Sequence, residues 1–169
     1  MARNTGSSGT PATTALARAG VAFTVRRYEH DPAAESFGLE AASALAVDPA
    51  RVLKTLLVTG ESGLAVAVVP VDTRLDLKAM AAALGVKKVA MAEPSQAERA
   101  TGYVVGGISP IGQKRSLTTV LDETALRHRT VLVSAGRRGM EIELTPTDLL
   151  AATGATAAAL SSGRDELHR

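Results

Sequence analysis

The chain has 169 residues, of which 46% are hydrophobic and 21% charged, a composition typical of one globular domain. It contains no cysteine, which excludes a disulfide framework, a thiolate nucleophile and a cysteine-ligated metal site. Nineteen Lys and Arg against 17 Asp and Glu leave a net charge of +2, too small by itself to predict nucleic-acid binding. The apolar runs are strand-sized, well short of the ~20 residues that a membrane span needs. We therefore expect a cytoplasmic protein that does not associate with membranes.

The two ends of the chain differ in composition from the region between them. Residues 1–9 are rich in Gly, Ser and Thr and predict a disordered leader without the apolar segment of a secretory signal. We expect a single domain over residues 10–160 and a frayed tail over 161–169.

In chain order, the apolar spacing and the Gly and Pro positions predict helices alternating irregularly with short strands. Helices are expected at 10–20, 36–46, 76–85, 94–100 and from Thr145 onward, and strands at 21–28, 52–59, 64–71, 86–91, 103–105, 117–121, 130–134 and 140–144. Residues 60–63 predict a four-residue hairpin loop, and the glycines of 106–112 predict a loop. This order favours an α+β fold with a mixed curled sheet or partial barrel of about seven strands surrounded by helices.

The sequence lacks the motifs of common catalytic sites. Its three histidines are scattered, and neither HExxH nor a dense carboxylate cluster is present, so we expect no metal and no cofactor. Residues 107–114 nearly match a phosphate-binding P-loop, but Gln113 stands where the motif needs lysine. The nucleophile motif GxSxG fails because Ile111 follows Pro110 in place of glycine.

Lys54 is unusual because it lies within an otherwise apolar predicted strand. Val52, Leu56 and Val58 share its strand face, and the opposite face is also largely apolar. A buried ammonium group costs several kcal/mol unless it is paired, so this side chain must reach a cavity or a partner. The pattern alone equally allows an edge-strand lysine that protects against aggregation, or one whose amine extends to solvent.

Two glycine-containing turns are further candidates. Consecutive glycines at 106–110 allow backbone N–H groups to converge on an oxyanion or phosphate, although a plain tight turn has the same composition. Ser134 ends a strand before a basic glycine turn, a pattern that is also that of an ordinary hairpin. Basic pairs lie beside predicted turns, where they are either solvated charges or contacts to the phosphates of a bound partner. These pairs are Lys87 with Lys88, Lys114 with Arg115, and Arg137 with Arg138.

Several short motifs occur together in a characteristic order. They are Tyr28 with His30-Asp31-Pro32, then Phe37-Gly38-Leu39-Glu40-Ala41-Ala42, Lys54-Thr55-Leu56-Leu57-Val58, Gly85-Val86-Lys87-Lys88, residues 101–110, Val133-Ser134-Ala135-Gly136 and Thr145-Pro146-Thr147-Asp148-Leu149. In this order the chain resembles the YbaK family of free-standing aminoacyl-tRNA deacylases, relatives of the editing domain inserted in bacterial prolyl-tRNA synthetase. The segment beginning at Phe37 favours the branch that acts on Cys-tRNA(Pro).

The resemblance implies a mixed α/β barrel-like fold and removal of cysteine from mischarged tRNA(Pro). It implies that Lys54 is an essential lysine near the terminal adenosine, and that Gly106 and Pro110 belong to a GxxxP loop facing the aminoacyl carbonyl. With the resemblance we also assign a set of substrate-binding residues. They are Tyr28, Phe37, Thr55, Gly107, Ser109, Ser134 and Glu141. The substrate's own thiol would attack its ester, so the protein would need no nucleophile.

Three other functions are compatible with these residues. One is hydrolysis of Ala-tRNA(Pro) with water as nucleophile, and another is a non-catalytic module that binds a nucleotide or aminoacyl-tRNA. The third is a regulatory partner of a synthetase. We expect aminoacyl-tRNA as the partner of the enzyme, with prolyl-tRNA synthetase as a further partner.

Overall fold

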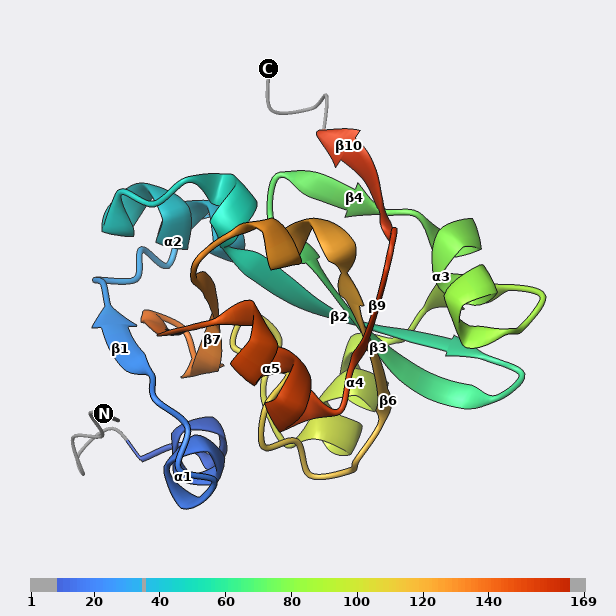
Figure 1. Ribbon diagram of the computed structural model, residues 1–169, viewed down its shortest axis with the longest axis horizontal. Helices are drawn as coiled ribbons and strands as arrows, with labels where there is room; N and C mark the ends of the chain where they lie inside the picture. The colour runs from blue at the N-terminus through green and yellow to red at the C-terminus, as the bar shows by residue number, and fades with distance from the viewer. Residues whose placement is uncertain (1–8, 35, 165–169) are drawn as a thin grey trace.

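The computed structural model describes residues 9–34 and 36–164, and over these residues it contains five α-helices and ten strands (Figure 1). The helices are α1 (Pro11–Arg18), α2 (Phe37–Leu45), α3 (Leu77–Leu84), α4 (Pro94–Thr101) and α5 (Pro146–Thr153). The strands are β1 (Thr24–Arg27), β2 (Leu53–Gly60), β3 (Gly63–Pro70), β4 (Thr73–Leu75), β5 (Val89–Met91), β6 (Thr118–Asp122), β7 (Val131–Arg137), β8 (Met140–Leu144), β9 (Thr156–Ala158) and β10 (Ser161–Arg164). The expected α+β class is confirmed, and the sheets do not close into a complete barrel.

The largest sheet has the strand order β5-β2-β3-β6-β9. β2 and β3 form an antiparallel hairpin, whereas β3 with β6 and β6 with β9 are parallel pairs. Gly60 pairs with Gly63 across the hairpin, so the loop has two residues and the expected four-residue loop is wrong. The two loop residues, Glu61 and Ser62, do not have positive φ, and the left-handed conformation lies instead at Gly63 (φ +94°), where the chain enters β3.

The second sheet has the order β1-β8-β7, and among the described residues one isolated backbone bridge links it to the segment that leads into β2. Val52, just before β2, forms an isolated parallel bridge with Leu132 of β7. At the other end of β2, β5 pairs only with residues 58–60. Among the described residues, no strand therefore pairs with the edge of β2 between these two contacts. This open edge positions the pocket described below.

Two apolar clusters lie on the two faces of the β2–β3 hairpin. The larger cluster includes Leu53 and Leu57, together with residues of α1, α4 and α5. The smaller cluster includes Val58 and Val69, with Met80 of α3 packed against them. Because successive side chains of a strand point to opposite faces, an apolar strand of this kind is covered on both sides.

The helix signals in the sequence have the expected structural roles. Thr10, Ser36, Asp76 and Thr145 are N-caps whose side chains accept hydrogen bonds from the first turn of α1, α2, α3 and α5. Gly85 ends α3 in the left-handed conformation, as a C-terminal glycine commonly does. None of the helices within the described residues is both long and apolar enough to cross a bilayer.

Residues 103–105 form turns, so the strand expected there is wrong. The Gly107 N–H donates to the Val104 carbonyl (2.9 Å) and the Val105 N–H to Glu98 of α4 (2.8 Å), which folds the chain back on itself. Three short strands were not predicted: β4, β9 and β10, each too short to show a periodicity.

The C-terminal segment differs from the expected frayed tail over 161–164. These residues form β10, antiparallel to β4. The buried Asp122 carboxylate accepts the N–H groups of Leu160 (2.8 Å) and Ser161 (3.0 Å), which anchors the start of the strand. The remaining part of that tail, 165–169, and residues 1–8 of the expected leader lie outside the described residues.

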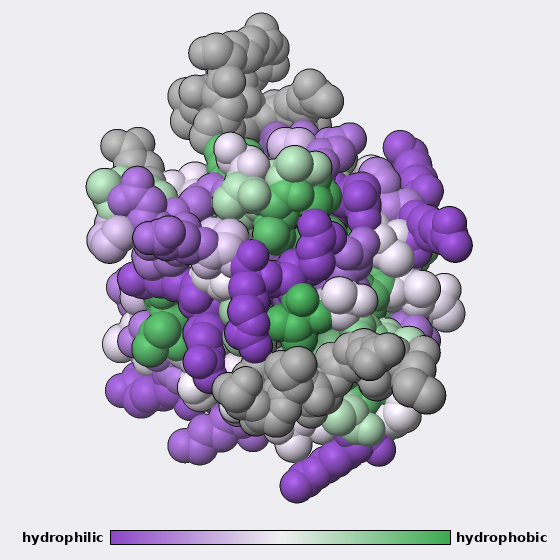
Figure 2. Space-filling model, turned by 90° about the vertical axis from the view of Figure 1, so that its left-hand side faces the viewer, coloured by the Kyte–Doolittle hydropathy of each residue, from purple (hydrophilic) through white to green (hydrophobic). Residues whose placement is uncertain are grey.

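On the face shown in Figure 2, hydrophilic side chains separate the hydrophobic areas from one another.

Candidate functional site

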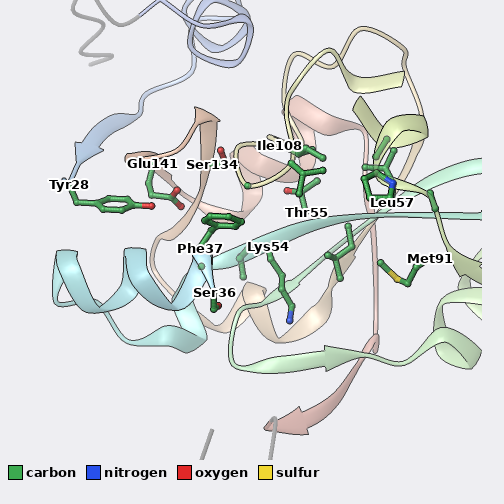
Figure 3. Close-up of a pocket in the computed structure, with 18 residues that line it drawn as sticks. Tyr28, Ser36, Phe37, Lys54, Thr55, Leu57, Met91, Ile108, Ser134 and Glu141 are labelled. Atoms are coloured by element: carbon green, nitrogen blue, oxygen red, sulfur yellow. The ribbon is translucent and has the colours of Figure 1, made fainter. Parts of the chain in front are cut away.

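A cavity of about 420 Å³ lies along the open edge of β2, between β7 on one side and β5 on the other (Figure 3). Because this edge carries no neighbouring strand, side chains from both faces of β2 line the cavity. The lining residues are Tyr28, Ser36, Phe37, Gly38, Leu53, Lys54, Thr55, Leu56, Leu57, Met91, Ala92, Pro94, Ala97, Val105, Gly106, Ile108, Ser134 and Glu141. We call this cavity the edge pocket.

Lys54 lies on the wall of the edge pocket and is half-buried. Its Nζ donates a hydrogen bond to the Thr73 carbonyl of β4 (2.7 Å). Thr73 is itself buried, and its hydroxyl donates to the Pro70 carbonyl (2.8 Å), so the acceptor is held at the β3–β4 turn. Figure 3 shows Lys54 and Thr55 leaving opposite faces of β2. Lys54 thus brings a cation to a wall that is otherwise mostly apolar.

Gly106 lines the edge pocket and has a φ of +92°, a conformation that side chains disfavour. A Cβ atom at this position would lie 2.5 Å from Nε of Arg138 and 3.0 Å from the Phe37 ring. The tight approach of Phe37 and Arg138 to the backbone therefore requires glycine here.

The other assigned residues of this loop do not line the edge pocket. Gly107 is buried against the backbone of Arg137, where a Cβ atom would lie 2.9 Å from Cα. Ser109 is fully buried, and its hydroxyl accepts the Ile111 N–H (3.2 Å). Pro110 is also buried. Gly107, Ser109 and Pro110, which we expected to bind substrate, thus lie outside the lining of the edge pocket, and the Gly107 N–H is committed to Val104.

Tyr28, Ser134 and Glu141 form the polar end of the edge pocket, where the Phe37 ring also lies. Glu141 of β8 is paired in register with Ser134 of β7, which brings both to one side of the second sheet. Figure 3 shows the Tyr28 hydroxyl directed toward the Glu141 carboxyl group, with the Phe37 ring close by. The structure therefore brings together two pairs of residues, Tyr28 with Phe37 and Ser134 with Glu141, that lie 97 or more positions apart in the sequence.

Glu141 is a buried acid, with 7% of its surface exposed. Burial raises its pKa to about 8, because a low-dielectric surrounding disfavours the charged form. The pKa of Tyr28 is raised as well, first by burial and then by the neighbouring Glu141 charge. Near neutral pH the Glu141 carboxyl group is therefore mostly protonated and can donate a hydrogen bond into the pocket.

Replacing Glu141 with glutamine is expected to remove a loss of stability that develops as pH rises from 4.5 to 8. The unfolded chain releases this proton near its ordinary pKa of 4.5, whereas the folded chain keeps it up to about pH 8. The free energy of unfolding therefore falls as pH rises from 4.5 to 8. Because each unit of pKa difference corresponds to ~1.4 kcal/mol, the total decrease is roughly 2–5 kcal/mol. Urea unfolding at pH 5 and pH 8 should show a smaller decrease for Glu141→Gln than for the wild type. Equal decreases in both proteins would contradict the buried, protonated state.

The opposite end of the edge pocket is apolar. It is formed by Leu57, Met91, Ala92, Pro94, Ala97, Val105 and Ile108. Thr55 Oγ1, on the same wall, is buried and has no hydrogen-bond partner within the described residues. Thr55 was predicted from the sequence, but the apolar residues were not, since nothing in β5 or α4 distinguishes a pocket wall from an ordinary core. Met91 and Val105 are 48% and 38% exposed, so this end reaches the surface.

The predicted basic pairs all lie at the surface, and none of their residues lines the edge pocket. Lys87 and Lys88 precede β5, and Lys114 and Arg115 follow the 106–112 loop. Arg138 differs from the others because its guanidinium group lies 4.5 Å from the centre of the Phe37 ring. Within the described residues, no group of three or more His, Cys, Asp or Glu is arranged to hold a metal ion.

Comparisons with known proteins agree on one family. A sequence model of the aminoacyl-tRNA editing domain matches residues 31–152, which include every residue of the edge pocket except Tyr28. EbsC of Enterococcus faecalis, described as a candidate Cys-tRNA(Pro)/Cys-tRNA(Cys) deacylase, is 45% identical over 113 residues, 66% of this chain and 69% of the relative.

Solved structures show the same likeness. The crystal structure of a candidate trans-editing enzyme for prolyl-tRNA synthetase has a TM-score of 0.82 and 30% identity, covering 95% of this chain and 100% of that one. The crystal structure of the hypothetical protein APE2540 has a TM-score of 0.81 and 28% identity, covering 90% and 100%. This chain therefore belongs to the family of aminoacyl-tRNA editing domains.

Proposed function

We propose that this protein is a trans-editing aminoacyl-tRNA deacylase that removes cysteine mischarged onto tRNA(Pro). The observation that carries the proposal is the edge pocket, which combines a lysine amine, a glycine turn and hydroxyl groups but, within the described residues, is lined by no histidine or cysteine. No lining residue can act as the imidazole base that activates a serine or threonine hydroxyl. A pocket of this composition suits a substrate that supplies its own nucleophile.

Cysteine esterified to tRNA carries such a nucleophile. Its thiol sulfur attacks the ester carbonyl carbon, the new C–S bond closes a thiolactone, and the C–O bond to the terminal ribose breaks. The thiol proton ends on the ribose oxygen, which frees the tRNA. The protein then supplies orientation and polarisation of the carbonyl, which are worth several kcal/mol each.

Gly106 and Lys54 are the residues to which we assign these contributions. Among the described residues no hydrogen bond uses the Gly106 N–H, so this amide is available to the aminoacyl carbonyl oxygen. Lys54 supplies positive charge for the terminal adenosine phosphate. Tyr28, Phe37, Thr55, Ser134 and Glu141 are proposed to bind the remaining parts of the aminoacyl-adenosine. A cavity of about 420 Å³ is of the size that binds small ligands.

The tRNA body would bind outside the pocket. Six exposed residues are proposed to contact its phosphates, namely Lys87, Lys88, Lys114, Arg115, Arg137 and Arg138. The net charge of +2 predicts weak, salt-sensitive binding that docking onto prolyl-tRNA synthetase would strengthen. Editing of this kind is needed because a synthetase pocket rejects an amino acid of similar size by only ~1–3 kcal/mol. Since its substrate is made there, the protein would act in the cytoplasm.

The decisive experiment compares tRNA(Pro) charged with cysteine, serine or alanine. Serine differs from cysteine by one atom, oxygen for sulfur, so we expect the purified protein to deacylate Cys-tRNA(Pro) at least tenfold faster than Ser-tRNA(Pro) or Ala-tRNA(Pro). Faster removal of alanine would instead indicate hydrolysis by water. Binding without deacylation of any of the three would indicate a non-catalytic module.

A further inference from the structure

Arg138 contacts two parts of the edge pocket at once. Its guanidinium group stacks over the Phe37 ring at 4.5 Å, and NH2 of the same group donates to the Val105 carbonyl at 2.8 Å. Phe37 begins α2, whereas Val105 belongs to the turn that follows α4. The side chain therefore bridges two segments of the pocket lining that lie 68 positions apart in the sequence.

The Val105 hydrogen bond also determines the direction of the next amide. A trans peptide is planar, so its C=O and N–H groups point in opposite directions. Holding the Val105 carbonyl on Arg138 therefore directs the Gly106 N–H away from Arg138. The same turn is held on its other side by Glu98, whose carboxylate accepts the Val105 N–H (2.8 Å). Both polar groups of the Val105 backbone are thus fixed by charged side chains.

The glycine at 106 allows this contact. Any Cβ atom there would lie 2.5 Å from Nε of Arg138 and 3.0 Å from the Phe37 ring, so the three groups are in direct contact only because the side chain is absent. The neighbouring Arg137 contrasts with this. It is exposed, and its side chain makes no hydrogen bond, ion pair or ring contact with another described residue.

We infer that Arg138 is a positioning residue that holds the Gly106 amide and the Phe37 ring in the arrangement that deacylation requires. This inference rests on the proposed function, and it separates Arg138 from the five other basic residues assigned to the tRNA backbone. A phosphate contact contributes to tRNA affinity and to its salt dependence. A positioning residue contributes instead to the rate at which the bound substrate is deacylated.

Single-turnover deacylation of Cys-tRNA(Pro) with excess enzyme tests the inference, with Arg137→Ala as the matched control that removes the same charge one residue away. We expect Arg138→Ala to lower the rate at saturating enzyme at least tenfold. Arg137→Ala, a change at a residue assigned to the tRNA phosphates, should act mainly on the half-saturating enzyme concentration and its salt dependence, so its saturating rate should clearly exceed that of Arg138→Ala. Arg138→Lys should restore the affinity lost with the charge but recover the saturating rate only in part, because an ammonium lacks the planar group that stacks and donates together. Equal saturating rates for Arg138→Ala and Arg137→Ala would overturn the inference.

Amide hydrogen exchange of the free protein tests the positioning role independently of any reaction. The amides of residues 104–107 should exchange at least fivefold faster in Arg138→Ala than in the wild type. In Arg137→Ala their exchange rates should equal those of the wild type. Unchanged exchange in Arg138→Ala would overturn the inference even if the protein is a deacylase. Failure of the wild type to deacylate Cys-tRNA(Pro), with the expected exchange difference present, would overturn the proposed function while retaining the structural role of Arg138.

Discussion

Replacing Lys54 with alanine is expected to lower the rate of Cys-tRNA(Pro) deacylation by about two to three orders of magnitude, the usual effect of removing one preorganised electrostatic group from an active site. Lys54 lies on a wall of the edge pocket that is otherwise formed mainly by aliphatic residues of β2. A charge in such surroundings acts more strongly on a phosphate or a developing negative charge than it would in water. Single-turnover deacylation measures the loss, and circular dichroism tests whether the fold is retained.

Two variants control this measurement. Lys54→Arg keeps the positive charge and should retain part of the activity, because a guanidinium group can still bind a phosphate. Lys78→Ala removes an exposed lysine of α3 that is not part of the pocket lining, and it should have no effect on the rate. An unchanged rate in Lys54→Ala, with the fold intact, would exclude Lys54 from the site.

Replacing Gly106 with alanine is expected to reduce deacylation at least a hundredfold and also to destabilise the protein. Its φ of +92° costs a non-glycine residue about 1–3 kcal/mol. The added Cβ would also collide with Arg138 and Phe37, so these side chains or the loop must move. Either movement redirects the Gly106 amide that we assign to the aminoacyl carbonyl. Urea unfolding gives the stability change, and the saturating single-turnover rate gives the catalytic one.

Gly63 provides a matched control for this substitution. It has nearly the same φ (+94°), but a Cβ atom there would meet nothing within 4 Å, since it lies in the exposed β2–β3 turn. Gly63→Ala should therefore show the cost of backbone strain alone and keep full deacylation. If both variants lost activity equally, the close contact at Gly106 would not explain its effect.

The local elements could be predicted because their causes lie within a few residues of one another. Thr10, Ser36, Asp76 and Thr145 cap helices through bonds to their own first turns, and Gly85 ends a helix by its own conformation. The β2–β3 hairpin follows from two β-branched runs around a polar turn. Two of the failures involve contacts that the local pattern of the strand does not show. Residues 103–105 have strand-like composition but are folded into turns by Glu98, and β10 is anchored by Asp122, 38 residues before Leu160.

For the candidate site, the sequence by itself determined which chemistry was available: a lysine in an apolar strand, a glycine loop and no cysteine or catalytic histidine motif. These depend only on which residues are present and in what local order. The tertiary structure alone decided that Gly106 faces the pocket while Gly107, Ser109 and Pro110 lie outside its lining, that Glu141 is buried deeply enough to hold a proton near neutral pH, and that Arg138 reaches Phe37. Burial, desolvation and close approach are set by neighbours distant in the chain, here by the open edge of β2 and the elements around it.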